Sequence, residues 1–489
     1  MSKLVRAFLS YFAAVLLILQ IINNSNAQDV AATIKIDAAR ATADVSGTYL
    51  NDATPRKRNF YFASTAGGSS NLGERISNVK LSKADGSSVA VRQLIPGEYL
   101  ADDDFSSWKY TIALSPDRSP SSSAHASWIN SDTGFLMLDD ILPQGSQAAA
   151  VKLVLPDSWK SVSLDQAGDA SSFKFASAAD AVIVIGKRIK TSNAEVDGVS
   201  LQLATSGDWL FTEAEALAMA TEIYSEYRKI FGAPHAGSAQ IAIARFPVQV
   251  SPGNWQAETR GRNLTIVSSD MNFRTQSLQR LHEQLRHEIF HLWLPNAVNL
   301  SGKYDWFYEG FALYQSLKTA VFMNRIGFDD FLDTLSRAYS IDSRQTKRLS
   351  LVEASKARFA GNDTQVYARG MIVAFLTDVT LMERSKGKSS VSDVLEAVFK
   401  RHSKSAPAAE GTGAVIEVLR SAGIGQEFVD RNITGSAPIE WNNELMAAGI
   451  QPPDTVAKTG LTVSPKPRGR QKALLDKLGY NNWRKLSSK

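Results

Sequence analysis

One short pattern constrains this chain more than any other: His287-Glu288-Ile289-Phe290-His291, an HExxH match inside a stretch with helical periodicity. A spacing of four residues puts both imidazoles on one helix face, so that their nitrogens can converge on a single metal ion. Glu288 then lies beside the ion, where its carboxylate can serve a water molecule. Histidine is scarce in the chain, so a chance match has odds below roughly one in a hundred. Two alternatives stay open, a purely structural zinc site and a pair of histidines on a helix surface.

The following segment offers a third ligand. We expect the helix of HExxH to span about 277–294, because Pro295 cannot continue it. Glu309, in the aromatic-rich run Trp-Phe-Tyr-Glu-Gly-Phe-Ala-Leu-Tyr over 306–314, would then lie on the next helix, antiparallel to the first. Taken alone, Glu309 is an ordinary helix carboxylate. Beside HExxH it can complete a His-His-Glu set around one Zn²⁺ ion, with a fourth position open to water.

The periodicity changes once along the chain, which predicts an α+β protein. Residues 28–206 contain alternating runs separated by Gly, Pro, Asp and Ser clusters, which is typical of strands. Thr212 and Glu215 then form a Thr-x-x-Glu capping box that opens a helix, and from Asp305 almost to Arg401 the pattern is helical. The chain is also longer than a single core usually supports. We therefore expect a signal peptide (1–27), a β-rich N-terminal domain (28–206), a mostly helical domain that carries HExxH (207–405), a helical C-terminal section (406–455) and a basic tail (456–489).

The beginning of the chain has the composition of a secretory signal peptide. Lys3 and Arg6 precede an apolar run over 7–22, and the small residues Ser25 and Ala27 suit cleavage at this point. The alternative is an uncleaved membrane anchor, although the run is short for a membrane-spanning helix. The chain has no cysteine and so cannot use disulfides. We expect an exported bacterial protein, periplasmic or secreted, with no stable membrane insertion after cleavage.

The formal net charge of +5 comes from the end of the chain. Residues 456–489 are rich in Lys and Arg and hold a single acidic residue, Asp476, so the remaining body of the chain is slightly acidic. The segment 464–470, Ser-Pro-Lys-Pro-Arg-Gly-Arg, is typical of a flexible basic arm. Such arms are usually solvated tails and occasionally contact an anionic surface. No strong nucleic-acid motif accompanies the arm, so we expect no nucleic-acid partner.

HExxH followed by an aromatic-rich Glu-Gly-Phe-Ala segment resembles the gluzincin zinc peptidases, which include the aminopeptidase N family. The interval between His291 and Glu309 is one residue shorter than in aminopeptidase N, and the nearest resemblance is to the glycyl aminopeptidase family. The similarity is strong over 280–380 and loose over segments at 108–112, 126–128, 136–143 and 428–450. That family typically carries a C-terminal PDZ domain, for which the roughly 35 residues after Pro453 are too few.

The resemblance implies a β-rich domain followed by a thermolysin-like catalytic domain that hydrolyses peptide bonds with zinc. The ligands would be His287, His291 and Glu309, and Glu288 would be the catalytic base. Tyr367, which opens a Tyr-Ala-Arg-Gly segment similar to a motif of the family, would donate a hydrogen bond to the oxyanion that develops during hydrolysis. The alternative for this tyrosine is packing in the helical core.

Recognition of a free α-amino group normally requires carboxylates near the zinc. Glu258 precedes HExxH at a point where relatives have a Gly-Gly-Leu-Glu-His or Gly-x-Met-Glu-Asn sequence, so the resemblance implies that it binds the substrate amine. The glycines are missing here, and an ordinary loop carboxylate is the alternative. Asp305 is expected either to bond a ligand histidine or to cap the helix that follows. His282 and Arg286 are expected on a solvated helix surface.

The leading hypothesis is a zinc aminopeptidase that acts on short peptides, with small N-terminal residues if the family preference holds. A zinc endopeptidase of the same fold stays open because the glycines around Glu258 are missing. A third hypothesis is a non-catalytic protein that keeps the fold and binds peptides or cell-surface material. The intact HExxH and Glu309 argue against it. The sequence predicts no particular oligomeric state.

Overall fold

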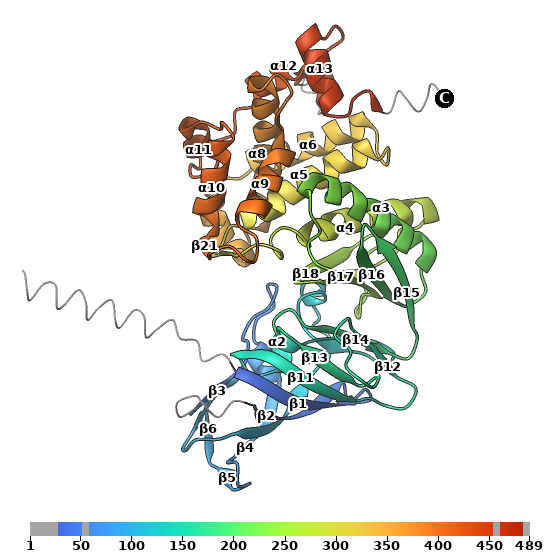
Figure 1. Ribbon diagram of the computed structural model, residues 1–489, viewed down its shortest axis with the longest axis vertical. Coiled ribbons are helices and arrows are strands. Elements are labelled where there is room, and N and C mark those ends of the chain that lie inside the picture. Colours follow the sequence, from blue (N-terminus) through green and yellow to red (C-terminus); the bar gives the residue numbers. More distant parts are fainter. Residues whose placement is uncertain (1–27, 51–57, 453–459, 483–489) are drawn as a thin grey trace, which may run out of the picture. The chain divides into compact units, whose positions relative to one another are not determined.

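The computed structural model describes residues 28–50, 58–452 and 460–482, which form two compact units (Figure 1). The first unit holds the described residues up to Ile189 together with Phe246–Gln249, and the second holds Lys190–Arg245 and the described residues from Val250 onward. The first is rich in strands and the second is mostly helical, which confirms the predicted α+β class. The predicted signal peptide lies outside the described residues. None of the helices that the structure describes is long and apolar enough to cross a bilayer.

The first unit contains three β-sheets. In the largest, β1 pairs in parallel with β11 and antiparallel with β2. In sheet order its seven strands are β13 (Ser172–Phe175), β11 (Ser146–Val154), β1 (Gln28–Asp37), β2 (Thr42–Tyr49), β8 (Ser107–Ala113), β4 (Ile76–Ser82) and β5 (Ser88–Val89). The second sheet has the order β12 (Lys160–Val162), β14 (Val182–Gly186), β10 (Thr133–Met137) and β9 (Trp128–Ile129). The third has the order β3 (Asn59–Tyr61), β7 (Glu98–Ala101) and β6 (Val91–Ile95).

Alternation along the strands separates the two faces of the seven-stranded sheet. Ile34, Val45, Trp108, Ile112 and Val151 are buried in one hydrophobic core with residues of the smaller sheets. Their immediate neighbours along each strand point to the opposite face. Strands occur along 28–206, the range in which the sequence analysis found alternating runs, so the period of two was a sound signal here.

The second unit opens with a mixed sheet. Its order is β15 (Ile189–Val196), β16 (Val199–Ser206), β17 (Ser238–Arg245), β19 (Asn263–Ser268) and β18 (Trp255–Arg260). The pairs β16–β17 and β17–β19 are parallel, whereas the edge strand β18 runs antiparallel to β19. The sequence analysis assigned β15 and β16 to the N-terminal domain. Strand periodicity carries no information about which sheet a strand joins, and in the structure β16 pairs with β17.

Helices make up most of the rest of the second unit. They are α3 (Glu213–Phe231), α4 (Arg274–His291), α5 (Asp305–Phe322), α6 (Phe328–Ser343), α7 (Leu351–Lys356), α8 (Asp363–Arg384), α9 (Val391–Arg401), α10 (Gly411–Ser421), α11 (Gln426–Asn432), α12 (Asn442–Ala447) and α13 (Gly469–Lys477). The predicted capping box is present: Thr212 Oγ1 accepts from the amide of Glu215, and the Glu215 carboxylate accepts from the amide of Thr212. The helix of HExxH starts and ends three residues earlier than predicted.

Two glycines let α5 and α8 approach each other closely. A Cβ atom built on Gly310 of α5 would lie 2.5 Å from the Cα of Gly370 in α8. A Cβ built on Gly370 would lie 2.8 Å from the carbonyl oxygen of Trp306. Real Cβ atoms do not come this near to backbone, so any larger residue would push the helices apart.

The described part of the basic tail packs on the helical unit. Leu474, Leu475 and Leu478 are buried in its hydrophobic core. Arg470 and Gln471 donate hydrogen bonds to the backbone carbonyls of Glu383 and Met446. The sequence analysis predicted a flexible basic arm over 464–470 and did not identify the helix that begins at Gly469. Burial of Leu474 and Leu475 in α13, and of Leu478 directly after it, holds this region on the helical unit despite its charge.

Gly310→Ala should destabilise the second unit by about 1–3 kcal/mol, because the added methyl group overpacks a backbone contact. The measurement is the free energy of unfolding in denaturant. Gly237→Ala is the matched control, since a Cβ at Gly237 meets no atom within 4 Å. If both variants unfold like the wild type, the close contact between α5 and α8 is wrong.

Candidate active site

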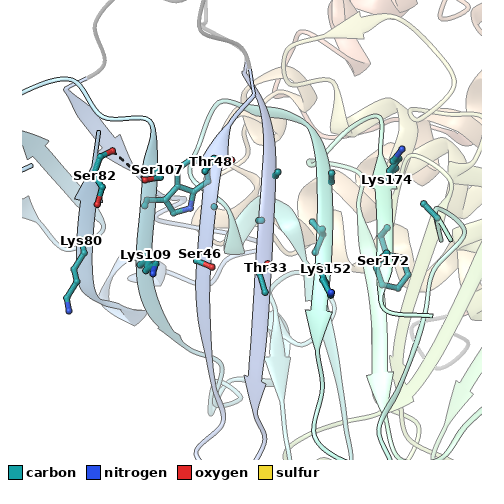
Figure 2. A pocket seen from close by; sticks show the side chains of 18 of the residues that line it. Thr33, Ser46, Thr48, Lys80, Ser82, Ser107, Lys109, Lys152, Ser172 and Lys174 are labelled. Atoms are coloured by element: carbon teal, nitrogen blue, oxygen red, sulfur yellow. Dashed lines mark hydrogen bonds between the residues drawn. The ribbon is translucent and has the colours of Figure 1, made fainter. Parts of the chain in front are cut away.

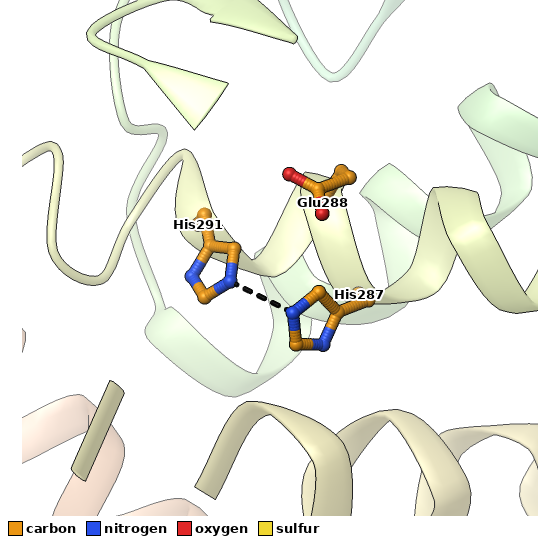
Figure 3. Close-up of side chains that lie close together, drawn as sticks. All are labelled: His287, Glu288 and His291. Carbon is orange, nitrogen blue, oxygen red and sulfur yellow. Dashed lines mark hydrogen bonds between the residues drawn. The ribbon is translucent and has the colours of Figure 1, made fainter. Parts of the chain in front are cut away.

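The last turns of α4 bring two imidazoles together. Figure 3 shows the rings of His287 and His291 directed toward each other, with their Nε2 atoms 3.1 Å apart. The Nδ1 atom of His291 lies 2.9 Å from the carbonyl oxygen of Leu294, which fixes the ring with Nε2 facing His287. Both histidines are buried. The four-residue spacing therefore produces the convergence that it predicted.

Glu309 of α5 completes a triangle with these histidines. Its Oε2 atom lies 3.2 Å from Nε2 of His287 and 3.4 Å from Nε2 of His291. Four-coordinate zinc holds N and O ligands at about 2.0–2.2 Å, which at tetrahedral angles separates the ligand atoms by about 3.3–3.5 Å. The three side chains thus fit a zinc ion in both donor type and spacing.

Glu288 lies next to the triangle and is held by the edge strand of the sheet. Its side chain is buried, and together with the two histidines it forms a group whose potential ligand atoms lie within 4.8 Å of one another (Figure 3). Thr259 Oγ1 of β18 donates to Oε2 of Glu288 over 2.8 Å and lies 3.1 Å from the backbone carbonyl of the same residue. Strand β18 therefore fixes the orientation of the carboxylate. The sequence analysis missed Thr259.

Arg358 links the acidic groups of the site and was also missed by the sequence analysis. Its guanidinium donates to Oε1 of Glu309 over 2.8 Å and to Oδ1 of Asp305 over 3.1 Å. It also donates to the hydroxyl of Tyr367. The Asp305 side chain does not cap α5. Its Oδ1 atom accepts from Arg358 and not from a histidine, because a charged donor bonds a carboxylate more strongly than a neutral donor does.

The charges of the site shift several pKa values. Burial raises the pKa of the Glu309 carboxyl, but Arg358 and His291 outweigh it and hold that pKa well below its usual range. Burial lowers the pKa of His291, but Glu309 and Glu288 outweigh it and leave it raised. Glu309 is therefore ionised at neutral pH, as a metal-binding carboxylate must be.

Tyr367 comes to the site from α8. Its ring centroid lies 6.3 Å from that of His287. Burial first, and then the charge of Glu309, raise the pKa of the Tyr367 phenol well above its usual value. The phenol therefore stays protonated at neutral pH and keeps a proton that it can donate.

Glu258 lies on β18 rather than in a loop. Its Oε2 atom accepts from Nε of Arg260 over 2.9 Å. Successive side chains of a strand point to opposite faces, so Thr259 rather than Glu258 is directed to Glu288. The strand was missed because its six residues are all partly exposed, and a strand without a buried face has no hydrophobic alternation.

His282 and Arg286 are buried, so their expected place on a solvated surface is wrong. Nε of Arg286 donates to the carbonyl oxygen of Ser316 in α5 over 3.0 Å, and its guanidinium contacts the ring of His282. Tyr227 of α3 donates to the carbonyl oxygen of Arg286 over 2.6 Å. These polar contacts join α4 to α3 and α5.

Comparison with known sequences finds similarity to M1 aminopeptidases over part of the chain. No protein-family model matches. A stretch of 144 residues, 28% of this chain, is 31% identical to the probable M1 family aminopeptidase 2 of Encephalitozoon cuniculi, of which it covers 16%. A stretch of 182 residues, 36% of this chain, is 28% identical to the membrane alanyl aminopeptidase of Manduca sexta, of which it covers 18%. The chain thus matches less than a fifth of either relative.

Solved structures resemble most of the chain. An aminopeptidase N family protein from Idiomarina loihiensis matches with a TM-score of 0.75 and 16% identity, over 88% of this chain and 81% of that one. A variant of the M1 zinc metallopeptidase from Deinococcus radiodurans, bound to a Tyr-Ser-Ala substrate, matches with a TM-score of 0.56 and 13% identity, over 85% and 95%. The fold expected from the gluzincin resemblance is confirmed: this chain has the two-domain fold of the M1 aminopeptidases, the aminopeptidase N family.

Proposed function

We propose that this chain is a zinc-dependent peptidase that removes N-terminal residues from short peptides. The observation that carries the proposal is the convergence of His287, His291 and Glu309, whose ligand atoms lie 3.1–3.4 Å apart. Glu288 lies one residue along the same helix, where a catalytic base is needed. The M1 fold supports the proposal because its solved neighbours include zinc metallopeptidases.

His287 and His291 would hold one zinc ion through Nε2, and Glu309 would hold it through Oε2. When bound, zinc supplies a Lewis acid that polarises a peptide carbonyl and lowers the pKa of a water molecule. Two imidazoles and one carboxylate are a donor set of catalytic zinc sites, whereas structural sites usually have four protein ligands. Among the described residues, HExxH provides the one group of His, Asp and Glu side chains arranged for a metal.

Glu288 would accept a proton from the attacking water and deliver it to the departing amine. Thr259 holds Oε2 of the carboxylate at 2.8 Å, so the base has a fixed direction before the substrate arrives. Because Glu288 is buried, bulk water does not compete for the proton in transit.

Tyr367 would donate a hydrogen bond to the oxyanion that forms when water adds to the carbonyl. Its raised pKa keeps the phenol neutral, which a donor requires. Arg358 donates to the same hydroxyl oxygen and so positions the ring relative to Glu309. The Tyr367 hydroxyl, held in place by Arg358, would therefore donate to the oxyanion as its negative charge develops.

A peptide with a free N-terminus is the proposed substrate, with small N-terminal residues preferred. The Deinococcus radiodurans neighbour is bound to a Tyr-Ser-Ala substrate, which supports the proposal that this chain acts on peptides. Glu258 stays the proposed ligand of the α-amino group. Nε of Arg260 donates to Oε2 of Glu258 over 2.9 Å, so Arg260 would compete with the substrate amine for this carboxylate. That ion pair favours the second candidate, an endopeptidase, because it leaves Glu258 partly neutralised.

We also propose that the chain is exported to a bacterial periplasm or secreted. The composition of 1–27 supports this proposal, as does the absence of cysteine from the sequence.

Glu288→Gln should lower peptide hydrolysis by about 10²–10⁴-fold, because the variant cannot accept a proton, while zinc binding is retained. The measurement is turnover of a set of dipeptides and their N-acetylated forms, with zinc content determined on the same samples. Glu283→Gln, an exposed residue on the same helix, is the control. Cleavage of free peptides alone indicates an aminopeptidase, and equal cleavage of blocked peptides indicates an endopeptidase. A fully active Glu288→Gln variant would exclude the mechanism.

Purified protein should contain about one zinc ion per chain, and Glu309→Gln should contain far less. Zinc at about 100 times its Kd should stabilise the fold by about 2.7 kcal/mol, so a strong chelator should lower the Tm. Thermal unfolding and metal analysis with and without chelator measure both effects. Wild-type zinc content in Glu309→Gln would show that this carboxylate is not a ligand.

Tyr367→Phe should reduce kcat by about 10²–10³-fold with little change in KM, because the lost hydrogen bond forms in the transition state. Since the phenol pKa is raised, ionisation of Tyr367 should cause no loss of wild-type activity up to about pH 10. The pH dependence of kcat and KM for both proteins tests this. An unchanged kcat would leave Tyr367 with a packing role only.

A further inference from the structure

The outward face of the seven-stranded sheet carries an ordered array of cations and hydroxyls. The register places one side chain from each of six neighbouring strands in a row across the strands. The row reads Lys80 (β4), Lys109 (β8), Ser46 (β2), Thr33 (β1), Lys152 (β11) and Ser172 (β13). Figure 2 shows this row crossing the sheet.

The next row, two residues along each strand, is built mainly from small side chains. It consists of Ser82, Ser107, Thr48, Ala31, Ala150 and Lys174. With alanine at two central positions, the face is hollowed into a groove of about 720 Å³, seen from close by in Figure 2. The groove belongs entirely to the first unit.

The four lysines of the groove are exposed, and the structure shows no ion pair for any of them within the described residues. Lys80 and Lys109 lie directly opposite each other on neighbouring strands. Like charges in this position destabilise a sheet, and a bound anion would relieve the repulsion. Asp44, on the same face one row further, is already bonded to the hydroxyl of Thr111 over 2.8 Å.

In the first row, lysines lie on both sides of two central hydroxyl side chains. Strands are spaced by about 4.8 Å, so Lys109 and Lys152, three strands apart, are separated by about 14 Å. Ser46 and Thr33 fill the interval with hydroxyls. A ligand that matches this pattern carries negative charges at intervals along a chain and hydroxyl groups between them.

We propose that this groove binds a linear acidic polysaccharide, whose carboxylates meet the lysines and whose hydroxyls bond the serines and threonines. The aromatic side chains that line the groove, Trp108 and Phe173, are buried in the core, so no ring is offered for base stacking and a single-stranded nucleic acid fits less well. A hollowed face without exposed apolar anchors also suits a polymer better than a flat membrane. The inference is independent of peptide hydrolysis.

The test is equilibrium binding of a polygalacturonate oligomer to the full chain at low salt, followed by the same titration with its methyl-esterified form. The ester keeps the hydroxyls and loses the charges. The wild type should bind the acid and not the ester. The variant Lys80→Gln, Lys109→Gln, Lys152→Gln, Lys174→Gln should raise the Kd roughly tenfold or more, since four exposed ion pairs are lost.

The control variant removes four exposed lysines outside the groove and has the same net charge: Lys160→Gln, Lys347→Gln, Lys404→Gln and Lys466→Gln. It should bind the acid as the wild type does, and the Tm of both variants should match the wild type. An equal loss in both variants would mean non-specific attraction and overturn the proposal. So would wild-type binding of the ester, no binding of the acid, or tighter lysine-dependent binding of single-stranded DNA or anionic lipid vesicles.

Discussion

The backbone contact between Gly310 and Gly370 determines how closely the helices that carry Glu309 and Tyr367 can approach. Glu309 directly precedes the first glycine, and Tyr367 lies about one helical turn before the second. A contact without side chains therefore brings the helix of the Glu309 carboxylate close to the helix of the Tyr367 phenol. Arg358, bonded to both, ties the two helices together at the same level.

Electrostatic balance is the second constraint on the site. Glu288, Asp305 and Glu309 are buried carboxylates, and Arg358 is the cation that the described structure places among them. Buried charges are costly unless compensated, and the acidic side chains here outnumber the arginine that faces them. A divalent ion held by His287, His291 and Glu309, as proposed, would add positive charge beside these acids.

The parts of the site that could be predicted from the sequence are those with short, periodic spacing. HExxH fixes two imidazoles through helix geometry alone, and the helical run around Glu309 supplies the third donor. Arg358 could not be found in this way, because it lies 49 residues from Glu309 and reaches it only through the packing of separate helices. Thr259 was missed for a different reason, since its edge strand has no buried face to create a pattern. In the fold, periodicity located strands and helices well but did not assign β15 and β16 to their sheet.

The packing of α13 has a consequence for the end of the chain. Leu474, Leu475 and Leu478 cover apolar surface of the helical unit, so a protein shortened before residue 460 would leave that surface open to water. Exposed apolar patches of this kind promote self-association. Proteolysis that removes α13 would thus affect solubility, and Arg470, Lys472 and Lys477 are carried on a helix that is packed in place.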